Sequence, residues 1–520
     1  MKSNILLPMA TVATMATILP LGACAQKDKQ QEAPKQPNVI VILADDLGYG
    51  DVSAYGSKTI NTPNIDKLGK QGVCFTNGYA TSATSTPSRY GMMTGMYPWK
   101  NENAKILPGD APLIISEDQN TLPKMFKKGG YVTGAIGKWH LGLGKGKVNW
   151  NETIKPGPNE IGFDYSCVIA ATVDRVPTVY VENGNVVGLE KNDPIEVDYN
   201  NSFEGEATAH KNPELMKLKY AHGHQDAVIN GIPRIGYMKG GNKARWIDED
   251  MADYFIDHVK DFISENKEKP FFLYYGIHQP HVPRTPHPRF VGTTTMGSRG
   301  DAIVEADWCI GELLATLESN GILENTIIVF SSDNGPVLND GYLDKAAELV
   351  GNHDQNGGLR GGKYSLYDAA TRVPFFVYWK DHIKPVVSDA LVCQLDFMAS
   401  FADLLNLDAS GATDSENVLP ALLGKTYNGR RDLVVEAESR LAYRQGDYIM
   451  MPPYKGEVKN LTGNELGNLT EFGLFNIVND PKQENNLAKK DPDLLEDLKQ
   501  KFFKKTGKYY KAEVESTTLK

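Results

Sequence analysis

The sequence predicts an α/β protein with a mostly parallel central sheet and a smaller α+β subdomain at its C-terminal end. Short apolar, β-branched runs alternate with amphipathic stretches of helical spacing through residues 38–408, which is typical of strand–helix units in a parallel sheet. The runs are continuously apolar, as expected for strands that helices cover on both faces. From residue 409 the chain changes to short strand-like pieces and turns, so we expect a separate subdomain over 409–520.

The bulk composition limits the class of protein. A chain of 520 residues exceeds one typical core, in agreement with two domains. Its formal net charge of −10 argues against a nucleic-acid partner, although a local basic pocket can still bind an anionic substrate. Apart from Cys24, the cysteines are too few and too scattered for a disulfide framework or a zinc cluster, so we expect buried free thiols. They are Cys74, Cys167, Cys309 and Cys393.

The first residues have the pattern of an export signal. Lys2 precedes an apolar run over residues 5–21, which predicts a signal peptide at 1–23. The small residues before Cys24 fit a bacterial lipoprotein cleavage site, with an ordinary signal peptide cut nearby as the alternative. Residues 24–37 then form a tether rich in Lys, Gln and Pro. We therefore expect the protein to be secreted across the inner membrane and to be a periplasmic or outer-membrane lipoprotein. A lipid anchor at Cys24 would be its only membrane contact.

The first predicted strand, at residues 38–44, ends in Asp45 and Asp46. Two adjacent carboxylates repel each other unless a cation or hydrogen-bond donors hold them, and a solvated turn is the alternative interpretation. Ligands of parallel sheets bind beyond the carboxyl ends of the strands, which favours a metal site here. A helix from about Asn64 follows.

Two further strands end in residues able to do chemistry. The strand at 131–136 is followed by Lys138 and His140, and the strand at 271–277 is followed by His278. Between them lie a long insert, at about 145–245, and an amphipathic helix at 248–266 that Asp248 could cap. Within the insert, His222-Gly223-His224 invites a metal interpretation, but no third ligand is nearby and a loop is favoured.

The last part of the first domain repeats this pattern. A helix at 302–319 leads to a strand at 326–330 that ends in Asp333 and Asn334, and a fifth strand follows at 373–379. In the C-terminal subdomain we expect strands at 433–437 and 448–450 and a helix at 491–505. Four strand ends of one parallel sheet point to one edge, so their polar residues can converge on one site.

The stretch that begins at Ser85 combines a nucleophile with an anion site. Ser85 stands two residues before Pro87, which suits the first position of a helix. Arg89 follows within one turn, so a guanidinium and open backbone N–H groups face the same place. Ser85 is therefore a candidate nucleophile, although many helices begin in this way and bind nothing.

These residues carry a resemblance to a known family. Ser85-Thr86-Pro87-Ser88-Arg89, followed by Thr94-Gly95, resembles the sulfatase signature over eleven positions. The resemblance implies an alkaline-phosphatase-like sandwich fold. It also implies that Ser85 is oxidised to formylglycine by a serine-type sulfatase maturase, and that the hydrate of this aldehyde is the nucleophile.

The candidate metal ligands offer only oxygen atoms, which favours calcium or magnesium over zinc. The resemblance to sulfatases implies that they bind calcium, with modified Ser85 as a further ligand. The set is Asp45, Asp46, Asp333 and Asn334.

The resemblance also implies the catalytic roles. Arg89 would stabilise the hydrate, and Lys363 would hold the sulfuryl group. Lys138 matches the lysine that the family pairs with a catalytic histidine. His140 would take a proton from the sulfated hydrate and so expel sulfate, and His278 would protonate the departing sugar oxygen. The family commonly has Glu-Gly-Gly before its Arg-Val-Pro, where this chain has residues 368–371, so the local backbone there is in doubt.

The sugar must be recognised by loops around the site. Candidate substrate contacts are Asp174, Arg175, His281 and Arg284. The chain resembles sulfatases of Bacteroides-type bacteria that act on sulfated glycans of mucin and glycosaminoglycans. We expect an exo-acting enzyme for galactose or N-acetylgalactosamine, sulfated at O6. The alternatives are a sulfatase for another sugar position, a phosphodiesterase or phosphonate hydrolase of the same superfamily, and a catalytically inactive sugar-binding protein.

Overall fold

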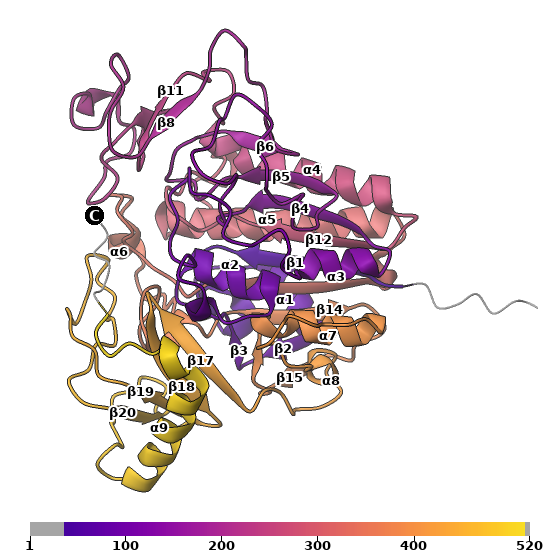
Figure 1. Ribbon diagram of the computed structural model, residues 1–520, viewed down its shortest axis with the longest axis vertical. Helices are drawn as coiled ribbons and strands as arrows, with labels where there is room; N and C mark the ends of the chain where they lie inside the picture. The colour runs from indigo at the N-terminus through magenta and orange to yellow at the C-terminus, as the bar shows by residue number, and fades with distance from the viewer. Residues whose placement is uncertain (1–35, 515–520) are drawn as a thin grey trace, which may run out of the picture. The chain divides into compact units, whose positions relative to one another are not determined.

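The computed structural model, which describes residues 36–514, is built on a ten-stranded sheet (Figure 1). Its middle strands β13, β1, β12, β4 and β5 are all parallel, and antiparallel pairings lie on either side of them, at β14 and at β6. The strands are, in order across the sheet, β15 (Val386–Ser388), β2 (Val73–Phe75), β14 (Phe375–Trp379), β13 (Thr326–Ser332), β1 (Asn38–Ala44), β12 (Phe271–Gly276), β4 (Val132–Lys138), β5 (Tyr165–Ile169), β6 (Tyr180–Glu182) and β7 (Asn185–Val186).

Helices cover both faces of this sheet, which is why its strands are continuously apolar. Alternate residues of β1 enter different hydrophobic clusters, Val39 and Val41 on one face and Ile40 and Ile42 on the other. The first face is covered by α2 (Ser85–Thr94), α3 (Leu122–Lys128), α7 (Phe397–Leu405) and α8 (Leu419–Leu422). The second is covered by α1 (Pro63–Gln71), α4 (Met251–Asn266) and α5 (Gly297–Ser319). The predicted α/β architecture is confirmed.

Some element bounds differ from the predicted ones. The strand predicted at 373–379 begins only at Phe375, after Pro374, and it runs antiparallel to β13. The helix predicted at 302–319 begins earlier, at Gly297. The strands at 131–136 and 326–330 extend to Lys138 and Ser332. These extensions carry the chain further towards the site.

Asp248 does not cap α4. It lies in a 3₁₀ turn, Asp248–Asp250, before the helix. Its carboxylate accepts hydrogen bonds from Arg234, at 2.7 and 2.8 Å, and from the indole N–H of Trp246 at 3.1 Å. Because the carboxylate is occupied by these buried donors, it ties the long insert to the start of α4.

The long insert contributes to the central sheet and forms small hairpins. Strands β5, β6 and β7 extend the sheet. The remainder forms β8 (Glu196–Asp198) with β11 (Tyr237–Lys239), and β9 (Val228–Ile229) with β10 (Ile232–Pro233). A short helix, α6 (Ala346–Leu349), and a two-strand pair, β3 (Gly78–Tyr79) with β16 (Val392–Cys393), lie elsewhere.

The C-terminal part is an antiparallel sheet with one helix, as expected for an α+β subdomain. Its elements are β17 (Asp432–Ala437), β18 (Arg440–Gln445), β19 (Tyr448–Met451), β20 (Gly473–Asn476) and α9 (Pro492–Thr506). Its apolar cluster includes Tyr79, Ala83 and Tyr97 from the first domain. The backbone of Ala83 also donates to the carbonyl of Glu436 at 2.8 Å. The two parts therefore share a core beside Ser85, and the domain boundary at 409 stays a prediction.

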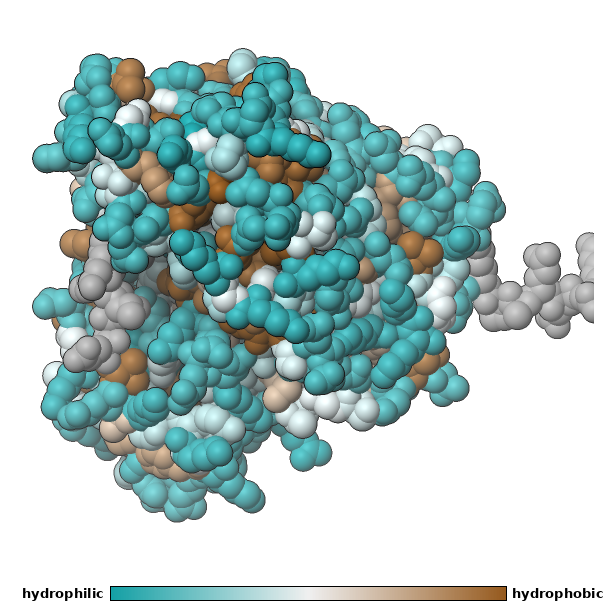
Figure 2. All heavy atoms as spheres, turned by 45° about the horizontal axis from the view of Figure 1, so that its top comes forward, coloured by the Kyte–Doolittle hydropathy of each residue, from teal (hydrophilic) through white to brown (hydrophobic). Residues whose placement is uncertain are grey.

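The predicted signal peptide and Cys24 lie outside the described residues, as does nearly all of the tether. Between residues 36 and 514, no helix combines the length and the apolar character needed to cross a membrane. The other four cysteines are buried and free, as expected. Figure 2 shows a mainly hydrophilic face on which hydrophobic side chains gather in small patches towards the middle.

Candidate active site

The ends of the parallel strands place the predicted reactive residues together. Asp45 and Asp46 follow β1, Lys138 ends β4, and Asp333 follows β13, and all four side chains are buried. The backbone bends sharply here, because Asp46 and His140 have positive φ angles of 63° and 57°. Such left-handed conformations cost energy and are concentrated at functional sites.

Ser85 is the first residue of α2, so the helix begins two residues earlier than the expected start at Pro87. Pro87 still lies in the first turn, where its missing N–H has no partner within the helix. The Ser85 hydroxyl donates to Asp333 at 2.6 Å and accepts from the Lys138 ammonium at 2.7 Å. Its oxygen also lies 3.3 Å from Asp45. The predicted nucleophile is thus held among carboxylates and a cation.

Arg89 forms hydrogen bonds with the residues around Ser85. Its guanidinium donates to Asp333 at 3.1 and 2.8 Å, to the Lys138 carbonyl at 3.2 Å, and to the Tyr274 hydroxyl. Burial raises the pKa of Asp333, but Arg89 and Lys138 outweigh burial and hold that pKa well below its usual range. Asp333 therefore stays ionised.

The pKa values of the other two aspartates fit a site that binds a cation. Burial raises the pKa of Asp45 to about 8, even though Lys138 opposes the shift. The pKa of Asp46 is also raised, by burial first and by its acidic neighbours, although Lys363 lowers it. Both shifts mean that the buried negative charge is under-compensated by the protein alone.

Asn334 supplies an independent observation that fits a bound cation. Its side-chain N–H donates to Asp46 at 2.7 Å, but its buried side-chain oxygen has no hydrogen-bond partner. A buried acceptor without a partner is costly. Three carboxylates and this unpaired amide oxygen form the all-oxygen set that calcium and magnesium prefer. These residues fit a hard divalent cation.

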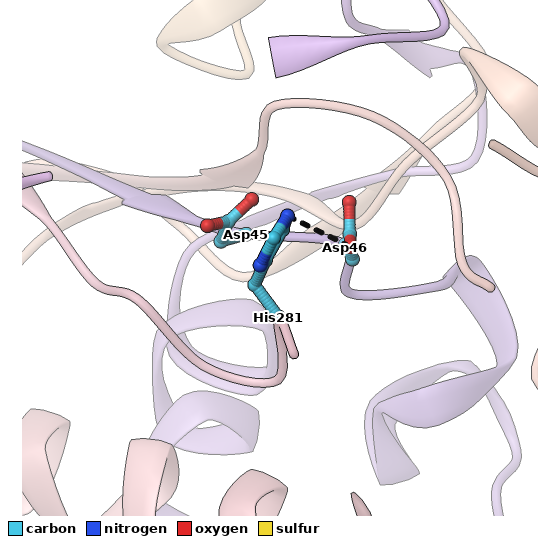
Figure 3. Close-up of side chains that lie close together, drawn as sticks. All are labelled: Asp45, Asp46 and His281. Atoms are coloured by element: carbon cyan, nitrogen blue, oxygen red, sulfur yellow. Dashed lines mark ion pairs between the residues drawn. The ribbon is translucent and has the colours of Figure 1, made fainter. Parts of the chain in front are cut away.

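His281 lies beside the same carboxylates. Figure 3 shows its ring between Asp45 and Asp46, and its Nε2 is 3.8 Å from Asp46. Its Nδ1 lies 2.6 Å from the Val282 carbonyl, so Nδ1 carries the proton and Nε2 faces the site. We favour the three carboxylates and Asn334 as metal ligands, because Asn334 offers an unpaired oxygen. With this ligand set, Nε2 of His281 is available for proton transfer. Across residues 36–514, Asp45, Asp46 and His281 are the only group of three or more His, Cys, Asp or Glu side chains close enough together to hold a metal ion.

Lys363 reaches the site although the chain departs from the family pattern just after it. Its ammonium lies 2.9 Å from Asp46 and 2.8 Å from Asp340. Burial lowers the pKa of Lys363, but Asp340 and Asp46 outweigh burial and keep the side chain charged. Sequence reasoning missed Asp340, which lies in a loop with no motif of its own.

His140 is arranged as a base. Its Nε2 lies 2.9 Å from the Leu107 carbonyl, so Nε2 carries the proton, and its buried Nδ1 has no partner. Burial and then the charge of Lys138 hold the pKa of His140 well below its usual range. The ring is therefore neutral, with an available lone pair on Nδ1.

Two residues predicted for the site lie away from its cavity. The cavity is lined by His281 and His140, whereas His278 does not line it, and burial lowers the pKa of His278 to about 4. Arg284 donates to Asp344 at 2.7 Å and to three backbone carbonyls at 2.9 Å each. Arg284 therefore holds loops together instead of lining the cavity.

Asp174 and Arg175 do line the cavity, and His224 joins them. Asp174 accepts from Arg175 at 2.9 Å and lies 2.8 Å from Nε2 of His224. Burial raises the pKa of Asp174, but Arg175 and His224 outweigh it and hold that pKa well below its usual range. His224 lies in a loop, as expected, and its Nε2 contacts Asp174.

The cavity between these groups has a volume of about 40 Å³. This is room for roughly three water molecules, so it suits a sulfuryl group better than a sugar ring. Its lining includes Ser85, His140, Asp174, Arg175 and Lys363. A sulfated sugar would place its ester in the cavity and its ring above it.

Comparison with known proteins agrees with this geometry. The sequence profile of the family described as Sulfatase matches residues 37–407. The N-acetylgalactosamine-6-O-sulfatase of Bacteroides thetaiotaomicron is 49% identical over 502 residues, which cover 94% of this chain and 98% of that protein. A solved structure from work on the metabolism of multiple glycosaminoglycans by the same organism has a TM-score of 0.89 and 49% identity, and the match covers 90% of this chain and 99% of that one.

A more distantly related solved structure has the same fold. The phosphonate monoester hydrolase of Agrobacterium radiobacter has a TM-score of 0.56 and 14% identity, over 91% of this chain and 96% of that one. It shares the fold alone, and the expected alkaline-phosphatase-like architecture is confirmed. The family profile and the relative of 49% identity go further: the chain belongs to the sulfatase family and is a sulfuric ester hydrolase.

Proposed function

We propose that this sulfatase uses calcium and a formylglycine derived from Ser85 to remove 6-O-sulfate from terminal N-acetylgalactosamine or galactose of a glycan. The main support for the sugar is the relative of 49% identity, whose name is N-acetylgalactosamine-6-O-sulfatase and whose length is matched over 98%. The main support for the chemistry is the contact of the Ser85 hydroxyl with Lys138 and Asp333 at 2.7 and 2.6 Å.

Two groups would complete the site. Calcium would be held by Asp45, Asp46, Asp333 and Asn334, and would supply positive charge against the sulfuryl oxygens. Formylglycine at position 85 would supply, as its hydrate, two hydroxyls on one carbon, one to act as nucleophile and one whose proton can be removed to release sulfate, whereas serine has a single hydroxyl. The remaining steps belong to the other side chains.

Lysine and arginine side chains position the reacting atoms. Lys138 lies 2.7 Å from the oxygen at position 85 and favours its negative charge, and Arg89 fixes Asp333 beside it. Lys363 faces the cavity and offers its ammonium to a sulfuryl oxygen. Because these donors are buried and already held in place, they stabilise developing charge without reorganisation.

Two histidines would move the protons. Nδ1 of His140 is free to take a proton in the step that releases inorganic sulfate. His281 would donate a proton from Nε2 to the departing sugar oxygen. Burial and the charges of Lys363 and Lys138 hold the pKa of His281 well below its usual range in the free protein. An anionic sulfate ester beside the ring raises that pKa, so the acid form appears in the complex.

Asp174, Arg175 and His224 would recognise the sugar. A carboxylate and a planar cation, fixed to each other by a 2.9 Å contact, can together bind two neighbouring hydroxyls of one ring. Replacement of Arg175 by Ala should raise KM for 6-sulfated N-acetylgalactosamine at least tenfold, with a smaller effect on an aryl sulfate that lacks the sugar. Equal losses on both substrates would assign Arg175 to the chemistry, and unchanged kinetics would exclude it as a sugar contact.

The protein also needs an outside partner and an export route. We propose that a serine-type maturase oxidises Ser85, and that the chain is exported and anchored as a lipoprotein through Cys24. Mass spectrometry of the peptide that contains Ser85 should show the loss of two hydrogen atoms after coexpression with the maturase. The matured protein should release sulfate from sulfated chromogenic esters and leave the matching phosphate esters intact. Faster release of phosphate would favour the phosphodiesterase alternative.

A further inference from the structure

A second cleft lies apart from the catalytic cavity, and the two share no lining residue. One wall comes from the first domain, with Tyr49 and Arg372, and the other from the C-terminal part, with Arg444 of β18. Tyr427 and Arg431, which precede β17, complete it. The cleft has a volume of about 1130 Å³, beyond the range of roughly 300–1,000 Å³ that is common for small-ligand sites.

The lining of this cleft is basic although the protein is acidic. Four arginines face two aspartates, Asp389 and Asp447, in a chain whose formal net charge is −10. Arg430 is paired with Asp396 and Glu416, and Arg372 with Asp368. Among the described residues, the lining guanidiniums without a carboxylate partner are therefore those of Arg431 and Arg444, and these can attract an anion to the cleft. The arginines are Arg372, Arg430, Arg431 and Arg444.

The guanidinium of Arg444 is incompletely hydrogen-bonded. The residue is 98% buried, and its guanidinium carbon lies 4.6 Å from the centre of the Tyr79 ring. Its Nε makes one long contact, 3.4 Å, with the Gly446 carbonyl, and its buried Nη1 has no hydrogen-bond partner at all. An unpaired buried guanidinium is costly, so an anion that accepts from it would be bound favourably.

Of the other arginines, Arg431 has donors to offer. No ion pair or hydrogen bond joins its exposed side chain to the rest of residues 36–514. Arg372 donates through Nε to the Thr76 carbonyl at 2.7 Å and through Nη1 to Asp368 at 3.2 Å, and it also contacts Tyr49. Arg430 differs, because Asp396 and Glu416 already neutralise it.

The rim of the cleft suits a sugar chain. Tyr427 is 61% exposed, and Tyr49, whose ring packs against Tyr55, also lines the cleft. Flat aromatic faces of this kind pack against the apolar faces of sugar rings. The volume is far larger than an inorganic sulfate needs, and planar guanidiniums bind carboxylates and sulfates through two parallel hydrogen bonds.

We propose that this cleft binds an anionic oligosaccharide, sulfated or carrying uronic acids, at a place separate from the catalytic cavity. The choice of a glycan rests on the proposed function. The cleft would hold a polymeric substrate by internal sugars while its terminal sulfate is removed elsewhere. It adds affinity for long chains and none for single sugars, because a monosaccharide in the catalytic cavity does not reach it.

The test compares cleft variants with a matched control. The variants are Arg431→Gln, Arg444→Gln and Tyr427→Ala, and the control is Lys128→Gln in a different basic hollow, lined by Lys124 and Lys127 as well. Calorimetry would measure Kd for a chondroitin 6-sulfate hexasaccharide, desulfated chondroitin and sodium sulfate. We expect each arginine variant to raise Kd for the hexasaccharide about tenfold. The control should stay within about twofold, and kcat/KM on a monosulfated monosaccharide should not change in any variant.

Several results would overturn the proposal. One is an unchanged Kd for the hexasaccharide in both Arg431→Gln and Tyr427→Ala. Another is an equal loss of hexasaccharide affinity in the control Lys128→Gln. The third is sodium sulfate binding as tightly as the hexasaccharide. Arg431 and Tyr427 are exposed, so these variants remain informative if Arg444→Gln does not fold. The binding measurement does not depend on turnover. A protein that binds the hexasaccharide through the cleft but releases no sulfate would therefore refute the proposed function and still support the proposed binding site in the cleft.

Discussion

Removal of one of two nearby histidines should separate the general acid from a structural neighbour. His281 lies 3.8 Å from Asp46 and lines the cavity, whereas His278, three residues earlier, does not line it. General acid catalysis by a positioned side chain contributes roughly 100- to 10,000-fold to a rate. His281→Ala should therefore lower kcat on a 6-sulfated sugar by that factor, which corresponds to about 3 to 5 kcal/mol of activation free energy. His278→Ala should cost less than tenfold.

The leaving group provides an internal control. A sugar alcohol leaves as a strongly basic oxygen and needs a proton, whereas 4-nitrophenol leaves readily as its anion. The defect of His281→Ala should therefore shrink to within about tenfold on 4-nitrophenyl sulfate. Stopped assays of sulfate release on both substrates would measure this. An equal defect on both esters, or a larger defect in His278→Ala than in His281→Ala, would refute the assignment.

Three other variants test separate parts of the site. Ser85→Ala should fold normally and release no sulfate after coexpression with a maturase, as circular dichroism and ion chromatography would show. Asp333→Asn should lose bound calcium and activity together, which metal analysis by mass spectrometry would detect. Burial raises the pKa of Glu436 from 4.5 to about 7, so the folded state binds the extra proton, and this group's contribution to stability falls as pH rises through that window. Glu436→Gln should flatten that fall in melting temperature, by up to about 3 kcal/mol of unfolding free energy between pH 4.5 and 7.

The strand ends were predictable from the sequence because their chemistry is local. A continuous apolar run followed by Asp45 and Asp46, or by Asp333, fixes both the strand and the place where it delivers its side chains. The sheet then brings these ends to one edge, whatever the loops do. The resemblance at Ser85 added the proposed nucleophile.

The loop residues could not be placed in this way. His278 and His281 stand in one short loop, and only the path of that loop decides which ring enters the cavity. His224 and Asp340 come from distant loops whose sequence does not indicate this role, and they reach the site through contacts with Asp174 and Lys363. Spacing along the chain does not encode such long-range contacts.

The most direct test of the account is the release of inorganic sulfate from a panel of monosulfated sugars by the matured protein. The panel holds 6-sulfated N-acetylgalactosamine, 6-sulfated galactose, 6-sulfated N-acetylglucosamine and 4-sulfated N-acetylgalactosamine, and Ser85→Ala serves as the blank. We predict fastest release from one of the two 6-sulfated galacto-configured sugars, and none from the blank. Preference for the glucosamine or the 4-sulfated sugar would contradict the proposed specificity, and sulfate release by Ser85→Ala would contradict the mechanism itself.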